Sequence, residues 1–141
     1  MLENKDFVYI PNMKFVDIID SGMAYYGSAI MTQRYIFLLV DTIDSVEEKR
    51  KSDCYNRLYV EKVLSNPQDF DVLSFETAML TDLDELHIFP FADLKKFEVT
   101  VGFSIFGGIK MVKNTKTLTS MSIKDVKVRK AIKEFYGKYI K

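Results

Sequence analysis

The chain has 141 residues, and its 20 lysine and arginine residues are balanced by 20 aspartate and glutamate residues. A chain without excess positive charge has no overall field to attract nucleic acid or an anionic membrane, so any such contact has to be local. With 48% hydrophobic residues it is long enough to bury a core, and we expect a single domain, residues 1–141.

Cysteine content and apolar runs restrict the class further. Cys54 is the only cysteine, which excludes an internal disulfide and a thiolate zinc cluster, and we expect it to be half buried on a helix. Residues 1–11 are charged and end at Pro11, unlike a signal peptide. The longest apolar run, Tyr35 to Val40, is too short to span a bilayer. We therefore expect a soluble, cytoplasmic protein.

The first 31 residues contain three extended segments. Residues 7–10 and 15–19 are apolar pieces separated by Pro11-Asn12, which predicts an N-terminal extension leading into a first strand. After a turn, residues 23–31 are small and aromatic and could form a strand, with Gly27 marking a bulge or a close backbone approach.

The next two segments predict a buried strand followed by a helix. Residues 34–41 have almost no polar alternation, which predicts a strand covered on both faces at the centre of the sheet. Residues 45–48, Ser-Val-Glu-Glu, form a capping box, so a helix should begin at Ser45 and end at Asn66-Pro67. Its apolar face is only partial, which favours packing against a sheet edge or a partner.

Residues 66–94 carry no lysine or arginine. Their acidic residues are Asp69, Asp71, Glu76, Asp82, Asp84, Glu85 and Asp93. Because apolar residues are interleaved with them, we expect this segment to be ordered but irregular, with a strand near Val72 to Glu76. It is either a binding surface or a solvated acidic face, and the sequence leaves both open.

The stretch from Phe97 to Met121 predicts an antiparallel meander. Apolar and polar residues alternate from Phe97 to Ile105, the period of a half-buried strand. Gly107-Gly108 can form a tight hairpin turn into residues 109–112, and a third strand follows through residues 117–121.

The chain closes with a predicted amphipathic helix, residues 125–139. Its apolar face consists of Val128, Ala131, Ile132, Phe135 and Tyr139, while Lys127, Lys130, Lys133 and Lys138 lie mostly off that face. We expect Phe135 to be inside, closing the open end of the sheet, and Lys130 and Lys133 to be exposed.

Residues 27–37 resemble the small-residue, aliphatic, Thr-x-x-Arg hairpin of bacterial pleckstrin-homology-like and GRAM-type domains. Residues 89–99 resemble the entry of those domains into their next strand, and the single closing helix is similar as well. The resemblance covers roughly residues 22–139. It implies a strongly bent antiparallel sheet or partly open barrel of about seven strands, plugged at one end by the final helix, with residues 45–86 as a long insertion. The family is a scaffold for lipid, peptide and self-association contacts.

Three constellations were tested for chemistry. Gly102 and Gly107 have the glycine spacing of a P-loop, but Gly108 stands where the phosphate-binding lysine is needed. The acidic residues at 82, 84 and 85 lack a calcium-loop motif, so a solvated face is the better interpretation. His87, the only histidine, lies between apolar residues and is more simply a structural residue than a catalytic one.

These observations predict an α+β, non-catalytic binding module that acts through protein contacts, including self-association. The acidic segment of one copy would meet basic surface on another copy or on a partner. The alternative is peripheral membrane binding through the basic face of the C-terminal helix; against it, the first hairpin offers only Lys14 and Arg34 and no basic cluster. We expect no enzymatic activity, no catalytic or metal-ligating residue, no cofactor and no nucleic-acid partner. The identity of the ligand or partner, the pathway and the oligomer size stay open.

Overall fold

The computed structural model of the chain describes residues 2–3, 6–17, 24–42, 65–66, 70–83, 87–103, 106–114 and 117–137. Within them the strands are β1 (Leu2–Glu3), β2 (Phe7–Asp17), β3 (Ala24–Thr32), β4 (Tyr35–Thr42), β5 (Ile88–Pro90), β6 (Lys96–Phe103), β7 (Phe106–Asn114) and β8 (Thr117–Ser122). The helices are α2 (Val72–Asp82), the short 3-10 helix η3 (Phe91–Asp93) and α3 (Val126–Phe135). The predictions for Cys54 and for a helix beginning at Ser45 lie outside the described residues.

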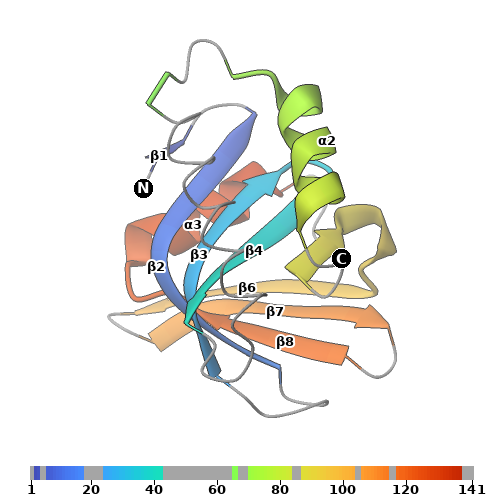
Figure 1. Ribbon diagram of the computed structural model, residues 1–141. Coiled ribbons are helices and arrows are strands. Elements are labelled where there is room, and N and C mark those ends of the chain that lie inside the picture. The colour runs from blue at the N-terminus through green and yellow to red at the C-terminus, as the bar shows by residue number, and fades with distance from the viewer. Residues whose placement is uncertain are drawn as a thin grey trace.

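The antiparallel strands follow the order β5-β4-β3-β2-β8-β7-β6, with β1 added to β2. Strand β2 joins a four-stranded part, β5 to β2, to a three-stranded part, β8 to β6, because residues 14–16 pair with both β3 and β8. Figure 1 shows β2–β4 running steeply while β6–β8 run across the lower part of the molecule. In the described part of the chain β5 and β6 do not pair, so the sheet is not closed into a barrel. The predicted α+β class is confirmed.

Strand β2 is continuous, whereas the sequence predicted two pieces separated by Pro11-Asn12. Its pairing with β3 shifts register between Ile10 and Met13, so the proline sits at a bulge. A bulge tolerates proline because the extra residue there makes no ladder hydrogen bond and needs no N–H. A second register shift, between β3 and β4 at Gly27, confirms the irregularity predicted for that glycine.

Strand β4 is buried on both faces, as predicted. Ile36 and Leu38 belong to a core shared with α3, and Phe37 and Leu39 belong to a core shared with α2. The two helices lie on opposite sides of β2–β4 (Figure 1). The predicted position at the centre of the sheet is wrong, because β4 is the second strand from one edge of the sheet and only the three-residue strand β5 lies beyond it.

Helix α2 replaces the strand predicted near Val72 to Glu76. Asp71 caps it: the carboxylate accepts hydrogen bonds from the Leu73 N–H at 3.3 Å and from the Ser74 hydroxyl at 2.6 Å. An aspartate in this position satisfies backbone donors that a helix start leaves open. The cap was overlooked because Asp71 is one of seven acidic residues in a segment that otherwise offered no single apolar stripe.

The closing helix is confirmed over residues 126–135. Asp125 caps it by accepting a hydrogen bond from the Lys127 N–H at 2.8 Å. The side chains that α3 buries are Val128, Arg129 and Ile132. Lys130 and Lys133 are exposed, as predicted.

The aromatic residue that closes the core differs from the prediction. Phe135 is only partly buried, whereas Tyr136, at the C-cap, is fully buried. The Tyr136 ring stacks on Phe91 at 4.7 Å between ring centroids, and its hydroxyl donates to the Thr32 carbonyl oxygen at 2.6 Å. Tyr139, predicted on the same face, lies outside the described residues.

Strands β6, β7 and β8 confirm the predicted meander, but the turn is not at Gly107-Gly108. Both glycines lie inside β7, and the chain turns between Phe103 and Phe106, which pair with each other. Glycine is required at position 108 for close packing, because a Cβ there would overlap the Met121 carbonyl oxygen of β8.

Candidate functional site

The β6–β7 hairpin ends in two exposed aromatic side chains, which we call the aromatic tip. Phe103 is 73% exposed and Phe106 is 63% exposed, and their ring centroids are 5.7 Å apart. Gly102 precedes them with φ +57°, and a Cβ there would overlap the Phe106 carbonyl oxygen. Burying a phenylalanine side chain gains about 1.5–3 kcal/mol, so two exposed rings side by side make the tip a candidate contact surface.

The hairpin is tied to α3 next to the aromatic tip, through Arg129. This side chain is fully buried, and its Nη1 donates to the Ile123 carbonyl oxygen at 2.9 Å. It passes over Gly107, where a Cβ would lie 2.7 Å from both its Cδ and its Nε. The Ile123 N–H in turn donates to the Gly107 carbonyl oxygen at 3.4 Å. The aromatic tip is therefore carried by an element that packs against the rest of the fold.

A row of exposed lysines begins beside the aromatic tip. It consists of Lys124, Lys127, Lys130 and Lys133. Lys124 follows Ile123, the residue bonded to β7, and the three-residue spacing of the others keeps them near one side of α3. The exposed acidic residues of the same region are Asp125, which serves as the helix cap, and Glu134. The surface next to the aromatic tip is therefore predominantly basic.

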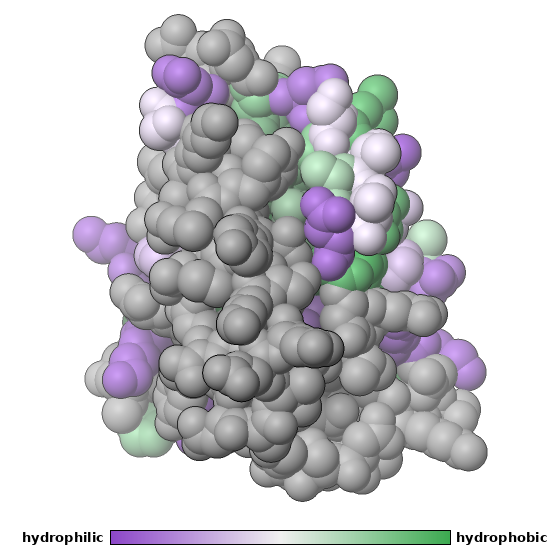
Figure 2. All heavy atoms as spheres, viewed as in Figure 1, coloured by the Kyte–Doolittle hydropathy of each residue, from purple (hydrophilic) through white to green (hydrophobic). Residues whose placement is uncertain are grey.

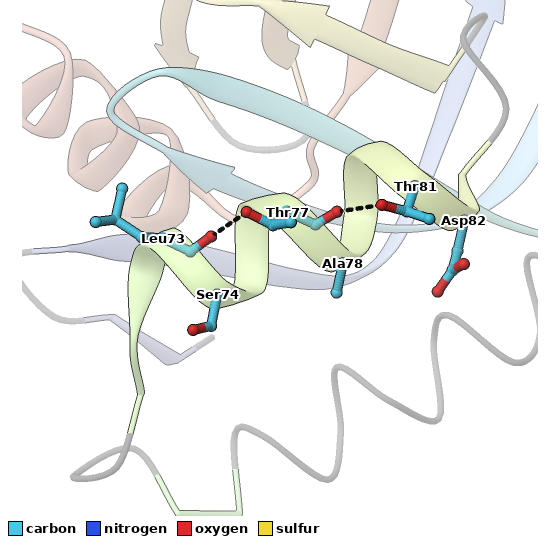
Figure 3. A pocket seen from close by; sticks show the side chains of 6 residues that line it. All are labelled: Leu73, Ser74, Thr77, Ala78, Thr81 and Asp82. Carbon is cyan, nitrogen blue, oxygen red and sulfur yellow. Dashed lines mark hydrogen bonds between the residues drawn. The ribbon is translucent and has the colours of Figure 1, made fainter.

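The outer side of α2 is hollowed by an open groove of about 480 Å³. The described residues that line it are Leu73, Ser74, Thr77, Ala78, Thr81 and Asp82 (Figure 3). The Thr77 hydroxyl donates to the Leu73 carbonyl oxygen and the Thr81 hydroxyl to that of Thr77, both at 2.8 Å. These two hydroxyl groups therefore bond within the helix, while Leu73 is 58% exposed and Thr77 and Thr81 are exposed as well.

Figure 2 shows hydrophobic and hydrophilic side chains side by side over α2. Asp71 and Asp82 are exposed at its two ends. The hydrogen bond from the Ser74 hydroxyl lowers the pKa of Asp71, so its carboxylate stays charged at neutral pH. The outer side of α2 thus combines apolar groups with negative charge at both ends.

The other acidic residues of this segment have different environments. Asp93 is exposed in η3, while Asp69, Asp84 and Glu85 lie outside the described residues. Glu76 is only 3% exposed, which the sequence analysis did not expect.

Glu76 belongs to a polar cluster that joins α2 to the β3–β4 turn and to the end of α3; Glu76 and Tyr136 are buried, whereas the Arg34 side chain is 58% exposed. Its Oε2 lies 2.8 Å from Nη2 of Arg34. Burial and the negative charge of Glu76 raise the pKa of Tyr136, whose hydroxyl donates to the Thr32 carbonyl oxygen. Because these groups engage one another, we assign the cluster to the stability of the fold and not to binding.

The other residues that the sequence suggested for chemistry do not form a catalytic, phosphate-binding or metal site among the described residues. His87 is buried, the location expected for a structural histidine. Gly102, Gly107 and Gly108 lie in strands of one hairpin, not in the strand-to-helix loop that a P-loop requires. In the part of the chain that the structure describes, no three His, Cys, Asp or Glu side chains gather in a possible metal site.

Sequence reasoning missed the aromatic tip because it placed Phe103 on the inward face of its strand. Phe97 is indeed buried, but exposure increases along β6 through the half-buried Val99 and Val101 to Phe103. The available signal was the sequence Phe-Ser-Ile-Phe between Gly102 and Gly107, in which apolar residues no longer alternate strictly. Strict alternation is the period that a one-sided strand requires.

No described helix has the length and apolar character that crossing a membrane requires. Comparison with protein-family models, with curated proteins and with solved structures found no match to this chain.

Proposed function

We propose that this chain is a non-catalytic binding module that acts through protein contacts, including contacts between its own copies. The observation that carries the proposal is the aromatic tip, Phe103 and Phe106, 73% and 63% exposed on a hairpin packed against α3. Aromatic residues are enriched at the centres of protein interfaces, where truncating such a residue typically costs about 2 kcal/mol or more of binding energy. The tip is thus built like an interface anchor.

The finer fold that we propose is pleckstrin-homology-like, a bent antiparallel sheet or partly open barrel. Support comes from the order of elements, since β2 to β8 are seven strands followed by one C-terminal helix. The core that contains Val128, Ile132 and Tyr136 of this C-terminal region also includes residues of both parts of the sheet. Helix α2 falls within residues 45–86, the stretch that the resemblance treats as an insertion. Such a scaffold hosts many kinds of contact, so the function rests on the surface and not on the fold.

Peripheral binding to an anionic membrane is the second candidate, and the lysine row of α3 favours it. Lysines near a surface attract anionic lipid by about 1 kcal/mol each. The first hairpin, however, adds little positive charge. Its described basic residues are Arg34, which is paired with Glu76, and Lys14, which is exposed. We therefore rank protein contact first and propose a cytoplasmic location.

Sedimentation velocity at two salt concentrations tests the proposal. The wild type should self-associate as its concentration rises, and the double variant Phe103→Ser/Phe106→Ser should stay monomeric. The matched control is Lys96→Ser/Glu98→Ser, which removes an exposed ion pair of 3.3 Å from the same strand and leaves the net charge unchanged. A wild type that is monomeric throughout, or a tip variant that associates like the wild type, would contradict the proposal.

Flotation with phosphatidylserine vesicles tests the second candidate. At physiological salt, charges interact over a reach of only about 8 Å, and the lysine row has acidic neighbours, so we expect little binding. Strong co-flotation that is lost in Lys130→Glu/Lys133→Glu would move the membrane to first place.

A further inference from the structure

The aromatic tip and the α2 groove have complementary chemistry. The tip is a convex aromatic pair, Phe103 and Phe106, with the basic residues Lys124 and Lys127 following in the adjoining segment. The groove is open, with Leu73 and threonine methyl groups along it and exposed carboxylates at the ends of its helix. Its volume is about 480 Å³, and the described residues that line it all belong to one face of α2.

Charge favours the same pairing. Segment 66–94, which contains α2, has no lysine or arginine, whereas the exposed charged residues that the structure describes after the tip hairpin are mostly lysines. Asp71 and Asp82 are 11 residues apart on α2, which is about 16 Å along the helix. Carboxylates at that separation can flank a docked hairpin and face its lysines, an arrangement that speeds encounter and selects orientation.

The tip of a copy cannot fill the groove of that copy. Figure 1 shows the end of the β6–β7 hairpin on the left of the molecule and α2 at the upper right. The helix that supports the tip, α3, and the helix that carries the groove, α2, pack on opposite sides of β2–β4. The two surfaces can meet only between copies.

We infer that the self-association proposed above is head-to-tail, with the aromatic tip of one copy docked in the α2 groove of the next. This inference rests on the proposed function and names the partner surface for the tip. A contact between two different surfaces leaves one tip and one groove open on every growing assembly. It therefore produces rings or open chains, unlike a symmetric contact between two tips, which stops at a dimer.

Mixing two complementary variants tests the inference. The tip variant Phe103→Ser/Phe106→Ser keeps its groove, and the groove variant Leu73→Lys/Ala78→Lys keeps its tip. Each variant alone should sediment as a monomer of 16.4 kDa, and the mixture should form a one-to-one complex, because one intact contact remains. Far-UV circular dichroism and urea unfolding show first that both variants fold, as expected for changes at the surface.

The remaining outcomes separate the two proposals. The complex should weaken by roughly tenfold or more between low and high salt, because charges flank the contact. If the wild type associates but the mixture forms no complex, or if the groove variant associates like the wild type, head-to-tail docking is overturned while self-association stands. If the wild type never associates, the proposed self-association and the head-to-tail docking are both overturned. Vesicle binding that requires the tip, without any protein complex, would assign the tip to a membrane.

Discussion

Replacing Tyr136 by alanine should remove a large share of the stability of the fold. The side chain is fully buried, and its ring lies 4.7 Å from that of Phe91 and 5.1 Å from that of Phe97, measured between centroids. Truncating such a ring costs about 3–5 kcal/mol, and losing its hydrogen bond to the Thr32 carbonyl adds about 0.5–1.5 kcal/mol. The sum approaches the lower end of the stability of small domains, about 5–15 kcal/mol.

The neighbouring ring gives the matched comparison. Phe135 packs edge-on against Tyr136 at 4.9 Å but is only partly buried, so Phe135→Ala should cost about 1–3 kcal/mol. The sequence predicted that Phe135 closes the open end of the sheet, whereas in the structure the fully buried ring is that of Tyr136. The variant Tyr136→Phe separates the hydroxyl from the ring and should lose about 0.5–1.5 kcal/mol.

Equilibrium urea unfolding of the three variants measures these differences, provided that the slope with denaturant stays constant. If Tyr136→Ala cannot be purified folded, Tyr136→Phe and Phe135→Ala still test the order. The reasoning is refuted if Phe135→Ala is as destabilising as Tyr136→Ala, or if Tyr136→Ala costs less than about 1 kcal/mol, because then the helix end would not close the core.

Four further predictions follow from the structure. Folding raises the pKa of Tyr136 above its ordinary value of about 10, so the protonated hydroxyl contributes fully to the free energy of unfolding below pH 10, and this contribution should be lost as the pH rises further. The variant Tyr136→Phe should remove that part of the pH dependence of the urea midpoint. Arg34→Gln should cost about 1–3 kcal/mol by leaving the Glu76 carboxylate buried without its cation, and adding Glu76→Gln should recover part of that cost in a double-mutant cycle. Lys130→Glu/Lys133→Glu should change the free energy of unfolding by less than about 1 kcal/mol, since both side chains are exposed; a larger loss would place them in the packing. Chelator should leave the melting temperature unchanged, and a drop of several degrees would reveal a metal that stabilises the fold.

The sequence correctly predicted the strands whose order of apolar and polar residues follows directly from which of their faces are buried. The uninterrupted apolar run from Tyr35 to Val40 predicted a strand covered on both sides, and the structure buries Ile36 to Leu39 between two cores. The alternation after Phe97 predicted the meander for the same reason. In each case a residue's neighbours in sequence were enough to indicate which side of the strand is covered.

The elements that it missed depend on contacts between distant segments. Arg129 was not among the residues predicted for the apolar face of the helix, yet it is fully buried and passes over Gly107, 22 residues earlier, which leaves room for its side chain. The buried apolar side chains of this region, Val128, Ile132 and Tyr136, recur every four residues, and Phe135 beside them is only partly buried. A charged residue that fills a space made by another strand cannot be identified from helical periodicity alone.

The surfaces that we assign to binding can be changed without breaking the cores, because Phe103, Phe106 and Leu73 are all more than half exposed. Their orientation nevertheless depends on the cores through Gly107. A side chain at that position would meet the Thr100 carbonyl oxygen at 2.5 Å and the buried Arg129 at 2.7 Å, so the hairpin would have to move away from α3. Neither the backbone carbonyl nor a fully buried side chain can shift cheaply in a close-packed interior. The glycine therefore couples the position of the aromatic tip to α3 and its lysine row, and the docking that we propose depends on this arrangement.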